Sequence, residues 1–191
     1  MYKYNKYIMS NLNNTIECPF IKNGYAKTYG ELTLEGLKKL LFKVQTKNKT
    51  FIDIGSGKGS VLINVINNYP LIKEVIGIEL DKERYDISLE RIKKKVSKKD
   101  QKKIKVINGD MLKDINYSNC DLVYISNLCF SESLNEKIAN KLNEELPQNA
   151  IVFTSNELKN IREHNKKNFT IKQTWTDNSN INKYSLKKIK K

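Results

Sequence analysis

Residues that build metal sites, disulfide frameworks and nucleophilic active sites are scarce in this chain. Its 191 residues include three cysteines, Cys18, Cys120 and Cys129, and one histidine, His164. Because the cysteines are odd in number and none belongs to a CxxC pair, we expect neither a disulfide framework nor a metal site, and a reducing compartment inside the cell. A single histidine also leaves little support for Ser-His or Cys-His catalysis.

Long apolar runs are missing as well. No run reaches the roughly 20 residues that a transmembrane helix requires, and residues 1–14 lack the apolar stretch of a signal peptide. We therefore expect no membrane association. The hydrophobic fraction of 39% and the chain length suit one folded domain with one core.

Positive charge, in contrast, is abundant. Lysine and arginine total 35 against 21 aspartates and glutamates, which gives a net charge of +14. Such a field favours acidic partners: nucleic acid, an anionic membrane, or a protein that lies on either. The alternative is that a Lys/Asn/Ile-rich chain reflects a biased genome and that many of its lysines are ordinary solvated surface.

Apolar periodicity divides the chain into alternating strands and helices. Residues 1–28 are polar and show no clear period, so we expect an arm there and a single domain over residues 29–191. We expect helices at 34–44 (with Thr33 as N-cap), 61–70, 81–103 and 133–147, strands at 50–55, 74–80, 104–110, 120–130 and 149–158, and a hairpin of 168–176 and 183–189 around a turn region at 177–182. This order predicts a doubly wound α/β fold with a mostly parallel sheet and a C-terminal antiparallel hairpin.

The strongest motif is the glycine-rich sequence Phe51–Gly59, which reads FIDIGSGKG, between the first strand and its helix. Gly55, Gly57 and Gly59 allow a tight turn and a close approach of ligand to backbone. In open α/β sheets, ligands bind outside the carboxyl ends of the strands. By itself the motif is a weak signal, since a dinucleotide or a phosphate uses a similar loop.

Carboxylates at neighbouring strand ends narrow the choice of ligand. Glu79 ends the second strand, where it is able to accept hydrogen bonds from both ribose hydroxyls of an adenosine. Asp110 and Met111 end the third strand, where they suit an adenine ring. Asp53 precedes the glycines and would face a cationic sulfonium, a feature that NAD sites lack, and Lys58 is followed by glycine, which excludes a phosphate-binding GK[ST] loop. This set resembles the seven-stranded class I S-adenosylmethionine-dependent methyltransferases, which have a Rossmann-like fold.

Further motifs narrow the resemblance. Tyr29-Gly30-Glu31 precedes the first strand, Asn127-Leu-Cys-Phe130 follows the fourth, and Trp175-Thr176 and Tyr184 lie in the hairpin. From Tyr29 to the C-terminus, the chain resembles the catalytic domain of the Dot-type (disruptor of telomeric silencing, non-SET) histone methyltransferases, which act on lysine 79 of histone H3. The resemblance implies transfer of a methyl group from S-adenosylmethionine to a lysine amine in nucleosomes, with S-adenosylhomocysteine as the product.

The resemblance also implies roles for individual residues. Tyr29 and Glu31 would close over the methionine part of the cofactor, Asp53, Gly55 and Ser56 would contact its amino acid portion, Glu79 would hold the ribose and Asp110 the adenine. The full set expected to contact the cofactor is Tyr29, Glu31, Asp53, Gly55, Ser56, Gly57, Gly59, Glu79, Asp110, Met111 and Asn127. The residues expected around the reacting lysine are Tyr124, Ser126, Asn127, Phe130, Trp175 and Tyr184. Considered singly, Tyr124, Trp175 and Tyr184 are better explained as core or strand packing, and their proposed role depends on their joint placement at the carboxyl edge of the sheet.

The chain departs from the family at three places. The family's paired asparagines are replaced here by Ser126-Asn127, and the paired tyrosines of its hairpin by Tyr184-Ser185. We expect its long helical N-terminal region to be missing or reduced to the arm before Tyr29. These departures bear on the histone specificity. The alternatives are another protein-lysine methyltransferase, an RNA methyltransferase, and a non-enzymatic DNA-binding module on a degenerate methyltransferase fold.

Two lysine-rich segments are candidates for contact with nucleosomal DNA: residues 93–105 and residues 187–191. The expected partners are therefore the histone and the DNA backbone. We expect a monomer located in the nucleus or another compartment that contains chromatin.

Overall fold

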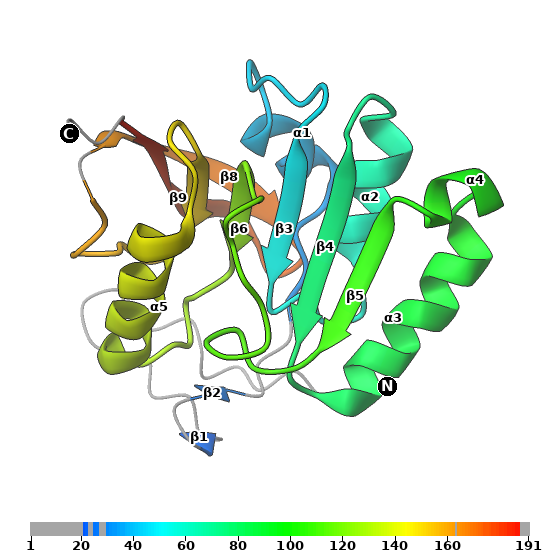
Figure 1. Cartoon of the computed structure of the whole chain (residues 1–191), viewed down its shortest axis with the longest axis horizontal. Helices are drawn as coiled ribbons and strands as arrows, with labels where there is room; N and C mark the ends of the chain where they lie inside the picture. The colour runs from blue at the N-terminus through cyan, green and yellow to red at the C-terminus, as the bar shows by residue number, and fades with distance from the viewer. Residues whose placement is uncertain (1–20, 23–24, 27–29, 163, 188–191) are drawn as a thin grey trace.

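A computed structural model describes residues 21–22, 25–26, 30–162 and 164–187 of the chain. Its centre is a seven-stranded mixed sheet with the strand order β5-β4-β3-β6-β7-β9-β8 (Figure 1). The doubly wound fold with its C-terminal hairpin is thereby confirmed. The N-terminal arm expected at residues 1–28 lies largely outside the described residues. Its described parts, β1 (Ile21–Lys22) and β2 (Tyr25–Ala26), pair with each other.

Five parallel strands form the centre of the sheet. They are β3 (Thr50–Ile54), β4 (Glu74–Glu79), β5 (Ile104–Asn108), β6 (Leu122–Ile125) and β7 (Ile151–Thr154). The strands β3 and β6 are buried along their whole length, as expected for strands covered on both faces. Two antiparallel strands, β8 (His164–Gln173) and β9 (Thr176–Leu186), complete the sheet beside β7.

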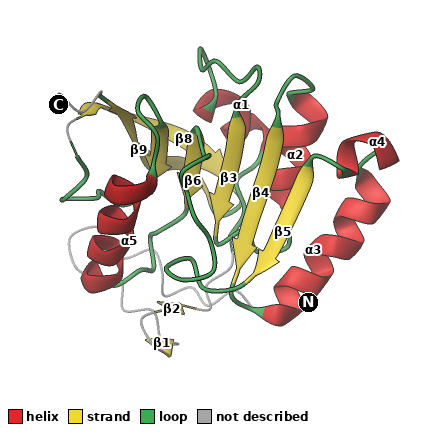
Figure 2. Cartoon of the chain, viewed as in Figure 1, coloured by secondary structure: helices red, strands yellow, loops and turns green. Residues whose placement is uncertain are grey.

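Helices cover the two faces of the sheet (Figure 2). They are α1 (Leu34–Leu40), α2 (Ser60–Asn68), α3 (Lys82–Lys95), α4 (Lys98–Gln101) and α5 (Glu132–Glu145). The buried side chains of α5 share one hydrophobic core with Ile52 and Ile54, whereas those of α1, α2 and α3 share another with Phe51 and Tyr124. Consecutive residues of a strand point to opposite faces, so the continuous apolar run of β3 supplies both cores.

The prediction of one continuous helix over residues 81–103 is wrong after Lys95. The helix α3 ends at Lys95, and α4 starts after Ser97, whose side chain accepts a hydrogen bond from the N–H of Asp100. A serine that caps a new turn competes with continuation of the helix, and the buried Val96 takes an extended conformation between the two helices.

The hairpin was predicted with its turn in the wrong place. Residues 177–182, rich in Asn and Asp and expected as the turn, form part of the strand β9. The turn lies instead at Thr174-Trp175, between the paired residues Gln173 and Thr176. Burial explains the difference, because Ser179 and Ile181 are buried and the side chain of Gln173 donates to Ser179.

The N-cap expected at Thr33 is confirmed. Its hydroxyl accepts a hydrogen bond from the N–H of Gly36 at 3.0 Å and donates to the carbonyl of Lys172 on β8 at 2.9 Å. We expect Thr33→Ala to lower the free energy of unfolding by about 1 kcal/mol, the usual cost of a lost N-cap. Urea denaturation measures this change. Thr33→Ser keeps the hydroxyl and serves as the control, and an equal loss in both variants would contradict the capping role.

In the part of the chain that the structure describes, no helix combines the length and apolar character needed to span a membrane.

Candidate cofactor site

The loop after β3 has the conformation that its glycines permit. Gly55, Gly57 and Gly59 all have positive φ angles, of 79°, 53° and 76°. The N–H groups of Gly55 and Ser56 donate to the carbonyl of Ile78 on β4, at 2.9 and 3.0 Å. A Cβ atom at Gly55 would meet no atom within 4 Å, so φ and not space requires glycine there. The exposed backbone at Gly55 is therefore open to a ligand.

Glu79, at the end of β4, fixes this loop. The side chain is 7% exposed; Oε2 accepts a hydrogen bond from the N–H of Gly57 at 2.8 Å, and Oε1 accepts one from the N–H of Asp81 at 2.9 Å. An ionised carboxylate has about four acceptor sites. Glu79 is thus able to hold the loop and still accept hydroxyl groups of a ribose.

Asp53 lies beneath the loop and is 3% exposed. Burial, and then the nearby carboxylates of Glu79 and Glu31, raise the pKa of Asp53 to about 8. Three carboxylates that gather around one loop favour a cationic ligand, whose charge would stabilise the ionised form of Asp53. The sulfonium and ammonium groups of S-adenosylmethionine are of this kind.

Buried polar atoms without a partner mark the same edge of the sheet. Among the described residues, the hydroxyls of Ser56, Tyr124 and Ser155 are buried and make no hydrogen bond. They belong to the ends of β3, β6 and β7, which are neighbours in the sheet. Buried polar groups are almost always paired, so three unpaired hydroxyls at one edge fit a bound ligand there.

Tyr124 lies directly beside Asp53 in the sheet, since the two residues are partners in the β3–β6 register. Burial and then the charge of Asp53 raise the pKa of Tyr124, against a smaller opposing contribution from Ser126. The structure therefore brings Asp53, Tyr124 and Ser126 together at the carboxyl edge, as expected.

The residues expected to hold the adenine follow β5 at the same edge of the sheet. Gly109 donates through its N–H to the carbonyl of Glu79 at 3.0 Å, which joins the ends of β4 and β5. Next to it, Asp110 accepts from the N–H of Leu112 at 2.8 Å, and Met111 is buried. Asp110 and Met111 thus follow β5 beside Glu79, in the order that an adenosine requires.

The side chain of Asn127 makes its hydrogen bonds within the protein. Its side chain is fully buried; Nδ2 donates to Asn135 Oδ1 at 2.6 Å and to the carbonyl of Asn156, and Oδ1 accepts from the N–H of Asn156 at 2.8 Å. With its hydrogen bonds used inside the protein, Asn127 joins the loop after β6 to α5 and to the loop after β7. Phe130 packs partly buried against the core on the α5 side.

Trp175 and Tyr184 are not brought together. They are nine residues apart, which corresponds to roughly 30 Å of extended strand. Tyr184 is fully buried opposite Val152 of β7, and its hydroxyl accepts from the N–H of Leu158 at 2.9 Å. Trp175 lies at the hairpin turn against Gly30, where a Cβ atom would overlap the indole ring. The expectation that both rings line one narrow channel is therefore not met.

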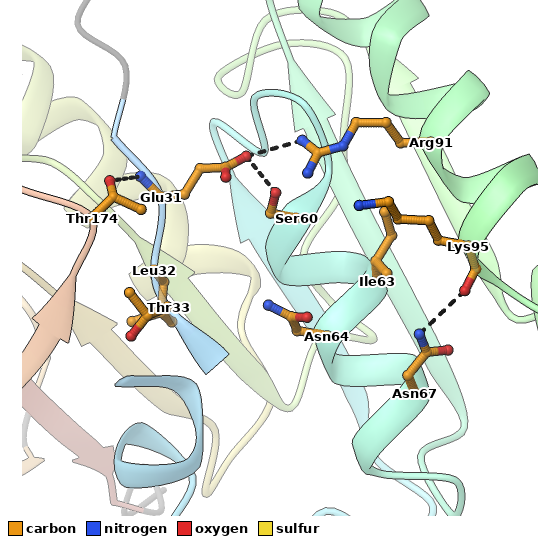
Figure 3. A pocket seen from close by; sticks show the side chains of 10 residues that line it. All are labelled: Glu31, Leu32, Thr33, Ser60, Ile63, Asn64, Asn67, Arg91, Lys95 and Thr174. Atoms are coloured by element: carbon orange, nitrogen blue, oxygen red, sulfur yellow. Dashed lines mark hydrogen bonds and ion pairs between the residues drawn. The ribbon is translucent and has the colours of Figure 1, made fainter. Parts of the chain in front are cut away.

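Glu31 connects the hairpin turn to the helices behind the loop (Figure 3). Its backbone exchanges hydrogen bonds with Thr174, and its carboxylate accepts from Ser60 Oγ and, at 3.1 Å, from Arg91 Nη1. A cavity of about 350 Å³ opens beside these residues, between α2 and α3, and away from the strand ends. Tyr29, expected next to Glu31, lies outside the described residues.

Several residues of the site escaped the sequence patterns. Arg91 looks like one more cation on a charged helix, and its partner Glu31 is 60 residues away. Ser155 and Asn156 follow β7 in a segment with no glycine to mark it. The one signal that could have identified Ser155 and Asn156 is their place directly after a parallel strand, since every parallel strand ends at this edge of the sheet.

A sequence model of the family described as histone methylation protein DOT1 matches residues 11–190. The Drosophila melanogaster protein named histone-lysine N-methyltransferase, H3 lysine-79 specific, is 31% identical over 122 residues, which make up 59% of this chain. The chain spans only a small part of that relative, since the match covers 6% of its length.

Solved structures are similar in fold. One is a Methanococcus maripaludis protein described as a candidate S-adenosyl-L-methionine-dependent methyltransferase. It is 13% identical, with a TM-score of 0.64, and the match covers 82% of this chain and 87% of the other. The S-adenosylmethionine-dependent methyltransferase SibL is 11% identical with a TM-score of 0.63, over 80% and 55% of the two chains. At these identities the similarity shows the methyltransferase fold, as expected from the sequence.

Proposed function

Because this chain belongs to the family of histone methylation protein DOT1, we propose that it is a histone-lysine N-methyltransferase that acts on lysine 79 of histone H3 in nucleosomes. The match of the family over residues 11–190 is the observation that carries this proposal. The carboxyl edge of the sheet supports it, since its acidic loop and unpaired hydroxyls fit S-adenosylmethionine.

S-adenosylmethionine supplies a methyl group on a sulfonium sulfur and leaves as S-adenosylhomocysteine. The residues of this chain bind the cofactor and orient the lysine nitrogen. In the proposal, Gly55 and Ser56 contact the amino acid portion, Asp53 faces the positive charge, Glu79 accepts the ribose hydroxyls, and Asp110 and Met111 hold the adenine. Because the transfer is an in-line displacement, orientation of the lysine nitrogen is the main demand on the protein.

The lysine would enter beside Tyr124 and Ser126, next to Asp53. A free lysine has a pKa of about 10.4, so its ammonium must lose a proton before the nitrogen forms a bond to the methyl carbon. Burial at Tyr124 disfavours the charged form of an entering lysine. We propose that the proton leaves to water before entry. A pH–rate profile that stays flat across the neutral to alkaline range would contradict this.

Label transfer tests the proposed acceptor. The protein is incubated with methyl-labelled S-adenosylmethionine and, separately, with nucleosomes, free histones, naked DNA and RNA. We expect label on nucleosomal histone H3, and none when lysine 79 of H3 is replaced by arginine. Label on DNA or RNA would contradict the proposal and favour a nucleic-acid methyltransferase. No label, together with DNA binding, would favour a non-enzymatic binding module.

Exposed lysines around α4 support a contact with DNA. Lys93, Lys98 and Lys99 are exposed at the end of α3 and on α4. We propose that the segment 93–105, together with 187–191, binds the DNA backbone of the nucleosome, and that the protein acts as a monomer in the nucleus. Of the second segment, only Lys187 is described.

We expect the triple variant Lys93→Gln, Lys98→Gln and Lys99→Gln to bind nucleosomes more weakly, with a salt slope lower by about one for each lost phosphate contact. Titration of labelled nucleosomes at several salt concentrations measures this slope. The control removes three exposed lysines from other elements, Lys38 and Lys39 of α1 and Lys137 of α5. Equal slopes in the two triple variants would contradict a specific role of the 93–105 segment.

A further inference from the structure

Arg91 joins three segments that are far apart in the sequence. Its Nη1 donates a hydrogen bond to Glu31 Oε1 at 3.1 Å and another to the carbonyl of Lys58 at 3.0 Å. Glu31 precedes α1, Lys58 belongs to the glycine-rich loop, and Arg91 lies on α3. The two charged side chains are about one quarter exposed, so the contact is partly shielded from water.

The contact with Lys58 completes the support of the loop. Glu79 holds the N–H of Gly57 from the side of the sheet, and Arg91 holds the carbonyl of the following residue, Lys58, from the side of α3. Both neighbours of Lys58 are glycines with positive φ. Glycines leave a backbone with many accessible conformations, so two charged hydrogen bonds to successive residues, Gly57 and Lys58, restrict this loop.

The contact with Glu31 ties the loop to the hairpin turn. The carbonyl of Glu31 accepts from the N–H of Thr174 at 2.9 Å, and its N–H donates to Thr174 Oγ1 at 3.0 Å. Its carboxylate also accepts from Ser60 at the start of α2 (Figure 3). Arg91 also supplies a positive charge next to Glu31, one of the carboxylates that surround Asp53. The guanidinium of Arg91 therefore fixes the position of the glycine-rich loop relative to the segment that contains Glu31.

We propose that Arg91 is a positioning residue for S-adenosylmethionine: it holds the glycine-rich loop and Glu31 in the arrangement that binds the cofactor, without contacting the reacting atoms. This inference rests on the proposed function for the identity of the cofactor. It assigns to α3 a role in cofactor affinity and none in the methyl-transfer step.

The test compares Arg91→Met and Arg91→Lys with the wild type. Calorimetric titration gives the Kd for S-adenosylmethionine, nucleosome methylation gives KM and kcat, and hydrogen exchange gives the protection of the loop amides. We expect Arg91→Met to raise Kd and KM for S-adenosylmethionine about tenfold, with kcat at saturating cofactor within about twofold of wild type. Arg91→Lys, which keeps the charge and donors, should stay within about threefold.

Lys141→Met is the matched control. It breaks the ion pair of Lys141 with Glu145 on α5, which is as buried as that of Arg91 but lies on the other face of the sheet. We expect it to change the thermal midpoint without changing the Kd or the exchange of residues 55–59. Thermal midpoints of all variants separate loss of fold from loss of loop order. If Arg91→Met does not fold, Arg91→Gln, which removes the charge and keeps a polar side chain, carries the test.

A wild-type Kd and unchanged loop exchange in folded Arg91→Met would overturn the inference. So would a loss confined to kcat. A protein that binds S-adenosylmethionine but labels no histone would contradict the proposed function, and in that case the change in Kd and in loop exchange still decides the role of Arg91.

Discussion

Replacing Glu79 by alanine is expected to lower the affinity for S-adenosylmethionine by about 100-fold or more. The variant removes the acceptor for the N–H of Gly57 and, in the proposed complex, the acceptor for the ribose hydroxyls. Hydrogen bonds to a charged group contribute about 1.5–3 kcal/mol each, so loss of the two bonds from the ribose hydroxyls corresponds to about 100-fold or more in Kd. Calorimetric titration of wild type and variant measures the difference.

The control for this prediction lies on the same strand. Glu74 is the first residue of β4, at the amino edge of the sheet, whereas Glu79 is the last. Glu74→Ala removes the same functional group from the opposite edge and should leave the Kd unchanged. Equal effects of the two variants would show that the affinity depends on overall charge and not on the carboxyl edge.

The second large effect is a dependence of cofactor binding on pH. Burial, Glu79 and Glu31 raise the pKa of Asp53 to about 8, so most Asp53 carries a proton at pH 6.5 when no ligand is bound. A cationic ligand favours the ionised form, and binding below pH 8 must therefore release this proton. Affinity should rise by about eightfold between pH 6.5 and pH 7.5, a range in which the α-amino group of the ligand stays mainly protonated.

Titrations in buffers of different ionisation enthalpy measure the released proton directly. The comparison is Asp53→Asn, which has no carboxyl to titrate; we expect weaker binding with little pH dependence over the same range. Proton release by the variant equal to that of wild type would contradict the assignment to Asp53.

Stability provides an independent check of the same group. Because the folded-state pKa of Asp53 is raised above its unfolded value of 3.8, its contribution to stability is greatest below that value and is lost as the pH rises through about 8. Because asparagine does not titrate, Asp53→Asn does not lose stability in this way as the pH rises. The gain in thermal midpoint over wild type should therefore be larger at pH 8.5 than at pH 6.

Much of this arrangement could be predicted from local patterns. The apolar run ending in Asp53-Ile54-Gly55, the carboxylate Glu79 at the end of the next strand, and the polar end of the third strand are all short-range signals. Parallel strands place their carboxyl ends at one edge, so correct strand assignment brings these residues together without further information.

The errors arose where long-range packing decides. Residues 177–182 have turn-forming composition, yet pairing with β8 and burial of Ile181 make them a strand. The motif predicts Tyr184 at the active site, but β9 pairs with β7 in a register that buries the Tyr184 side chain in the core. Arg91 and Asn127 act through partners 60 and 29 residues away, and no local pattern contains that information.

A crystal structure of the protein with S-adenosylhomocysteine tests the central claim most directly. The account predicts the ribose hydroxyls on Glu79, the amino acid portion over Gly55 and Ser56 next to Asp53, and the adenine beside Asp110 and Met111. Ligand bound instead in the cavity between α2 and α3, or no ligand bound at saturating concentration, would contradict it.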